Sequence, residues 1–244
     1  MKKSEAPREK PALRGVIHQA AAWCALGAGS VLVAVAPTTR AQVAVAVFTL
    51  SLIELFAVSA IYHRVNWIGE RSRATMRRLD HASIFILIAG TYTPVAILGI
   101  GGANGQRLLI AVWSGALAGV LMSVFWVKAP KALRAAVAVA VGWTIVPFFG
   151  EARQLLGADL WLILAGGIAY TAGAVIYAVR RPNPLPRVFG YHELFHALTV
   201  VGALLHFIAI LHMSGAATRP GGGASERLVP RNESSMTYGH AARL

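Results

Sequence analysis

The sequence predicts an all-α membrane protein, a bundle of seven transmembrane helices. Of its 244 residues, 56% are hydrophobic and only 14% are charged, whereas soluble domains carry about 25% charged residues. The mean hydropathy is +0.59. Seven apolar runs, almost free of Lys and Arg, each approach the length of about 20 residues that a helix needs to cross a bilayer. They are residues 16–36, 41–62, 82–100, 108–127, 133–149, 160–179 and 194–213.

The runs are continuous rather than alternating, which favours helices, because a helix satisfies its own backbone hydrogen bonds in lipid. The first run is followed at once by a second span, so we interpret it as a retained helix and not a signal peptide. Gly115 and Gly119 form a small-xxx-small pair that favours close helix packing. We therefore expect a disordered basic tail over residues 1–14, a membrane domain over 15–213 and a disordered tail over 214–244.

The distribution of positive charge predicts the orientation. Most of the 23 Lys and Arg residues lie before the first run and in the second, fourth and sixth loops. Positive loops stay in the cytoplasm, so the sequence predicts a multi-pass cell-membrane protein with its N-terminus inside and its C-terminus outside. The same asymmetry accounts for the formal net charge of +13, and we expect no nucleic-acid partner. The single cysteine, Cys24, excludes an intramolecular disulfide and a Cys-based metal cage.

Ionisable side chains within membrane spans are costly and usually functional, and most of those present here share one depth. Ser59 and His63 are four residues apart near the cytoplasmic end of the second run, so they share a helix face. Asp80 opens the third run. His192 and His196, again four apart, open the seventh. The topology thus brings these five side chains to the inner leaflet.

This set favours a catalytic zinc site. Three His ligands leave a tetrahedral Zn²⁺ with one open position for water. All-His ligation with water suits zinc well, and the sequence leaves iron and manganese open. His63, His192 and His196 are the predicted ligands, with Asp80 and Ser59 as catalytic residues beside them. Each residue also has a structural interpretation: Asp80 as a helix N-cap, Ser59 bonded to a helix carbonyl, and the histidines as interfacial residues.

Other polar residues fit the site less well. His206 lies about 15 Å along the helix from His196, and Glu54 lies about 13.5 Å from His63 on the opposite face, so neither can share the ion. We expect Glu54 to be a neutral core acid. His18 has no spaced partner and is interpreted as a packing residue, while His81 is an alternative to His63 as third ligand.

Three motifs resemble those of the bacterial hemolysin III family, the prokaryotic branch of the progestin and adipoQ receptor (PAQR) superfamily that includes the adiponectin receptors. They are SAIYH at 59–63, RLDHASIFILIAGTYTP at 78–94 and GYHELFH at 190–196, followed by His206 and Phe207. The resemblance covers about Val16 to Met213. The basic first fourteen residues and the long tail fall outside it, and His18 matches the family's first-span histidine motif only loosely.

The resemblance implies seven helices, a cytoplasmic N-terminus, and Zn²⁺ held by His63, His192 and His196 with Asp80 and Ser59 adjacent. It also implies similarity to alkaline ceramidases and a link to membrane-lipid homeostasis in bacteria. The leading hypothesis is therefore a zinc-dependent hydrolase of a membrane-lipid amide or ester in the bacterial inner membrane. The sequence leaves the oligomeric state and the lipid open.

Two alternatives remain. In the first, the protein is not an enzyme but either a sensor whose helix packing is held by structural zinc or a cytolysin. The second is an intramembrane metalloprotease, because His192-Glu193-Leu194-Phe195-His196 satisfies H-E-x-x-H with Glu193 as general base. The extended protease pattern would require a histidine at position 202, which is Gly202.

Overall fold

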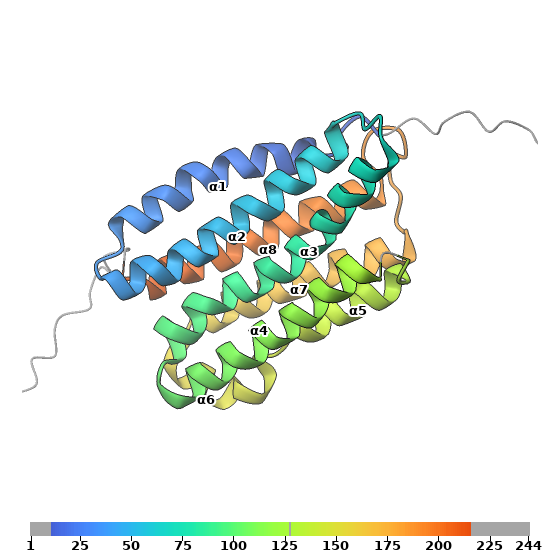
Figure 1. The fold of residues 1–244 in the computed structure, drawn as a ribbon. Helices are drawn as coiled ribbons and strands as arrows, with labels where there is room; N and C mark the ends of the chain where they lie inside the picture. The colour runs from blue at the N-terminus through green and yellow to red at the C-terminus, as the bar shows by residue number, and fades with distance from the viewer. Residues whose placement is uncertain (1–10, 127, 216–244) are drawn as a thin grey trace, which may run out of the picture.

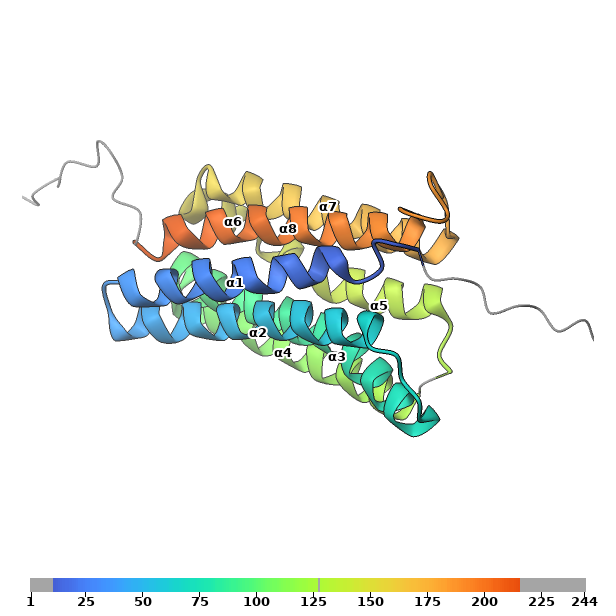
Figure 2. The ribbon, with the colours of Figure 1, turned by 90° about the horizontal axis from the view of Figure 1, so that it is seen from above.

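The computed structural model describes residues 11–126 and 128–215, and it is all-helical apart from turns and one isolated bridge. Its elements are α1 (Val16–Val35), α2 (Thr39–Arg64), α3 (Glu70–Pro94), the π-helix η1 (Val95–Ile100), α4 (Gly102–Phe125), α5 (Lys131–Gly142), the 3₁₀ turn η2 (Val146–Phe148), α6 (Phe149–Leu156), α7 (Asp159–Val179) and α8 (Tyr191–Met213). Helices that follow one another pack side by side, and α8 closes the bundle against α1 (Figures 1 and 2).

Seven helical segments of the described chain are long and apolar enough to cross a membrane. Large apolar side chains such as Trp23, Leu50 and Trp161 are exposed on the outside of the bundle. An exposed apolar surface of this kind is costly in water and natural in lipid. The chain is a multi-pass membrane protein, as the sequence predicts.

The predicted tails lie largely outside the described residues, which leave out 1–10 and 216–244. Residues 11–14, assigned to the basic tail, form a turn whose Ala12 and Leu13 amides donate to the carbonyls of Arg187 and Val188 at 3.0 and 3.2 Å. This turn places Arg14 at the start of α1, next to the loop that leads into α8.

The third helix begins twelve residues earlier than predicted, at Glu70 instead of residue 82. The apolar criterion missed this stretch because it carries Arg71, Arg73, Arg77 and Arg78, although arginine is a good helix former. Figure 2 shows the first turns of α3 diverging from α7 and α8.

The fifth span is broken, where the sequence predicts one helix over 133–149. α5 ends at Gly142, and Pro147 lies in the following 3₁₀ turn, where its missing N–H costs no α-helical hydrogen bond. The Tyr92 hydroxyl of α3 donates to the Gly142 carbonyl (2.6 Å) and accepts from the Ile145 amide (3.2 Å). One side chain thereby satisfies two backbone groups that lipid could not.

The small-xxx-small pair of α4 serves helix packing, as predicted, but toward two different neighbours. A Cβ at Gly115 would meet Val141 of α5 at 3.1 Å, and one at Gly119 would overlap the buried Phe85 ring of α3. The helices approach closely because neither position carries a side chain.

We expect Gly119→Leu to lower the free energy of unfolding by about 1–3 kcal/mol, because the added side chain has to displace Phe85 from a packed core. Thermal unfolding in detergent measures the change. Gly27→Ala is the matched control, since a Cβ there meets nothing within 4 Å. Equal stability of the two variants would show that the α3–α4 contact is loosely packed.

Candidate metal centre

Three histidines meet at one end of the bundle. His63 is the penultimate residue of α2, and His192 and His196 lie one turn apart at the start of α8. One nitrogen from each ring lies within 4.8 Å of the others, and the Nε2 atoms of His63 and His192 are 3.2 Å apart. The predicted convergence of these three side chains is confirmed.

The spacing of these nitrogens fits a metal ion. Two ligands of a tetrahedral Zn²⁺, each at about 2.0–2.1 Å, lie about 3.3 Å apart, close to the separation of the two Nε2 atoms. His196 is only 2% exposed, so the group faces little competition from bulk water. These three histidines can hold a divalent ion.

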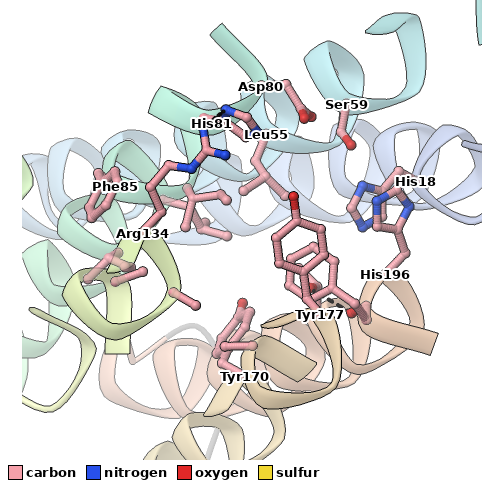
Figure 3. A pocket seen from close by; sticks show the side chains of 18 of the residues that line it. His18, Leu55, Ser59, Asp80, His81, Phe85, Arg134, Tyr170, Tyr177 and His196 are labelled. Carbon is pink, nitrogen blue, oxygen red and sulfur yellow. Dashed lines mark hydrogen bonds between the residues drawn. The ribbon is translucent and has the colours of Figure 1, made fainter. Parts of the chain in front are cut away.

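Asp80 and Ser59 line the same cavity as the three histidines. Asp80 is not an N-cap, because α3 begins ten residues earlier and the aspartate lies within the helix. Ser59 is buried one turn before His63. Figure 3 shows the two side chains facing one another in the cavity wall.

The cavity has a volume of about 500 Å³. From the histidines it extends toward Tyr170 and His206 near the middle of the membrane domain, between apolar side chains that include Leu55, Phe85 and Ile88. Figure 3 shows Tyr170, Tyr177 and Leu55 around this space, with His196 at its edge. It therefore joins a polar site to an apolar chamber.

His18 of α1 belongs to the site, although its sequence context indicates only packing. Its ring stacks on that of His196, with centroids 3.8 Å apart and planes 7° from parallel. Both ring nitrogens are buried without a hydrogen-bond partner among the described residues. His18 has no partner on its own helix face, so the sequence signals for it were its depth in the first span and a loose match to the family's first-span histidine motif.

We expect His18→Ala to weaken metal binding by about 10–100-fold, the usual effect of losing a group that orients a ligand. His18→Phe keeps an aromatic face against His196 and is expected to retain most of the affinity. Competition with a chromophoric chelator measures both variants. If His18→Phe binds as weakly as His18→Ala, the ring nitrogens matter and the stack does not.

Glu193 is engaged elsewhere. Its Oε2 accepts from the Gly190 amide at 2.9 Å, and its Oε1 pairs with Arg14. The side chain is 1% exposed and is absent from the cavity wall. One carboxylate oxygen thus caps the first turn of α8, and the other forms an ion pair with Arg14, just before α1. This engagement of both oxygens argues against Glu193 as the base of a metalloprotease.

The remaining histidines of the described chain also have other roles. His81 Nδ1 lies 2.8 Å from Arg134 Nη1, so it is not drawn into the three-histidine group. His206 contacts the Ile163 carbonyl at 2.9 Å, and His212 pairs with Asp159 at 2.7 Å at the far end of the bundle. Glu54 is half-buried on α2 and lies outside the cavity wall.

Comparison with known protein sequences identifies the family of the chain and several relatives. Residues 7–207 match the family described as Haemolysin-III related. The chain is 29% identical to the Hemolysin-3 homolog of Bacillus subtilis (68% of this chain, 74% of that protein) and 30% identical to Hemolysin-3 of Bacillus cereus (71% and 76%). It is also 30% identical to the heptahelical transmembrane protein ADIPOR2 of Oryza sativa (67% and 79%).

Proposed function

Since the chain belongs to the Haemolysin-III related family, with distant homology to the adiponectin-receptor (PAQR) proteins, we propose that it is a zinc-dependent hydrolase of a membrane-lipid amide or ester. One observation carries the proposal. The three-histidine group, Asp80 and Ser59 all open into one cavity whose deeper wall is apolar. Such a cavity accommodates an acyl chain beside a polar reaction site.

Each residue has a task in this scheme. His63, His192 and His196 would hold the ion, which would supply a Lewis acid to polarise the scissile carbonyl and activate water. Asp80 accepts the proton of the attacking water and returns it to the leaving amine or alcohol. Ser59 faces Asp80 in the cavity wall and is placed to orient its carboxyl group. Leu55, Phe85 and Ile88 exclude bulk water around the acyl chain.

The substrate would enter from the inner leaflet. Of the Lys and Arg residues in the described ranges, all but Arg40, Arg107 and Arg153 lie toward the end of the bundle that holds the histidines. The positive-inside rule assigns that end to the cytoplasm. A lipid that diffuses laterally between helices would then present its head group to the metal centre.

Turnover of fluorescent lipids tests the proposal. Purified wild type in detergent is expected to cleave a ceramide-like amide or an acyl ester, and His196→Ala and chelated wild type are expected to be inactive. His212→Ala, which alters a histidine at the far end of the bundle, is the matched control. Equal turnover by wild type and His196→Ala would refute the hydrolase.

The name Hemolysin-3 of the Bacillus cereus relative supports a second candidate, a non-enzymatic cytolysin. Dye release from liposomes that persists after chelation would favour this function. A zinc-clamped sensor is the other non-enzymatic version, because the three histidines join α2 to α8. Metal-dependent stability without turnover of either lipid would favour the sensor.

A further inference from the structure

The cavity is strongly basic at the end of the bundle that holds the histidines. Five cationic side chains line it, against the single carboxylate of Asp80. They are Arg14, Arg73, Arg77, Lys131 and Arg134. Within the described ranges only Arg14 among them is in an ion pair, with Glu193. The other four, called here the basic mouth, carry more positive charge than Asp80 can balance.

Two cations of the basic mouth are held in place by uncharged groups. Arg134 Nη1 lies 2.8 Å from His81 Nδ1. A guanidinium group only donates hydrogen bonds, so Nδ1 is the acceptor and the imidazole proton is on Nε2. Lys131 Nζ lies 5.0 Å from the centre of the Tyr177 ring. These contacts orient both cations over the cavity and leave their charges uncompensated; Figure 3 shows Arg134 beside His81 in the wall.

Retention of positive loops in the cytoplasm does not account for this arrangement. The positive-inside rule is satisfied equally well by cations outside the cavity wall, namely Arg71, Arg180 and Arg181. The rule places no cation against an imidazole or a tyrosine ring. Cations gathered around a cavity repel one another, and an anion bound between them relieves the repulsion.

We propose that the basic mouth binds the phosphate head group of a lipid whose acyl chain lies in the apolar part of the cavity. A phosphate monoester carries up to two negative charges, which matches the excess of cations over Asp80 better than a single carboxylate does. Guanidinium groups such as those of Arg77 and Arg134 form bidentate hydrogen bonds with phosphate oxygens. The inference rests on the proposed function only in treating the cavity as a lipid site.

Binding of matched amphiphiles to chelator-treated protein in phosphatidylcholine nanodiscs tests the inference. Wild type is expected to bind dodecyl phosphate at least about tenfold more tightly than dodecanol, since charge-assisted hydrogen bonds each contribute a factor of this order. Arg134→Gln and Arg77→Gln are each expected to lower the affinity for dodecyl phosphate about tenfold. Arg71→Gln, on the same helix as Arg77 but outside the cavity wall, is the matched control and is expected to bind like wild type.

Three results would overturn the inference. Equal binding of dodecyl phosphate and dodecanol would show that the phosphate group adds nothing to binding. Equal losses in Arg71→Gln and Arg134→Gln would indicate only general surface charge, and binding of inorganic phosphate as tight as that of dodecyl phosphate would indicate a site for the free anion. Dodecyl phosphate contains no amide or carboxylic ester, so failure here leaves the hydrolase intact, and absent hydrolysis leaves this binding intact.

Discussion

Wild-type protein is expected to purify with one divalent ion per chain, and His63→Ala, His192→Ala and His196→Ala are each expected to lose it. Two nitrogens cannot replace the three that now lie within 4.8 Å of one another. Loss of a direct ligand should weaken binding by more than the roughly 100-fold upper range for supporting groups. Elemental analysis measures the metal content.

Thermal unfolding gives an independent measure of the same site. An ion at 100 times its dissociation constant stabilises the folded protein by about 2.7 kcal/mol, so a chelator should destabilise wild type and leave His196→Ala unchanged. His81→Ala is the sharpest control. The sequence allows His81 as an alternative third ligand, whereas in the structure its ring contacts Arg134. Metal loss in His81→Ala together with metal retention in His63→Ala would reverse the ligand assignment.

Asp80→Asn is expected to lower lipid hydrolysis by about 10²–10⁴-fold, the contribution of a general acid–base group, while metal content stays at the wild-type level. The amide keeps the size of the carboxyl group but cannot accept a proton at neutral pH. Initial rates with the fluorescent amide lipid, measured at saturating zinc, separate a chemical defect from metal loss.

Glu193→Gln, compared with Asp80→Asn, shows which of the two carboxylates acts as the general base. Its amide oxygen can still accept from the Gly190 amide, as Glu193 Oε2 does now, so α8 keeps its start and activity is expected to persist. Asp159→Asn tests for a general effect of removing a buried carboxylate at the other end of the bundle. Full activity in Asp80→Asn with none in Glu193→Gln would restore the metalloprotease hypothesis.

The sequence by itself determined the seven spans and the shared depth of His63, His192 and His196. Span length follows from bilayer thickness, and a spacing of four residues puts His192 and His196 on one helix face whatever surrounds them. Successive spans alternate in direction, so the end of the second span and the start of the seventh lie on the same side of the membrane. This places His63 at the same end of the bundle as His192 and His196. These features depend on local geometry and on alternating direction along the chain, so no knowledge of helix packing was needed.

The tertiary structure alone decided which residues complete the site. The stack of His18 on His196, the pairing of Arg14 with Glu193 and the contact of Arg134 with His81 each join different helices or their flanking turns. Such contacts depend on how each helix is rotated about its axis and tilted against its neighbours, and that is set by packing such as Gly119 against Phe85. The break in the fifth span is likewise stable because Tyr92, on another helix, satisfies its free backbone groups. Periodicity fixes relations within one helix, and only packing fixes relations between helices.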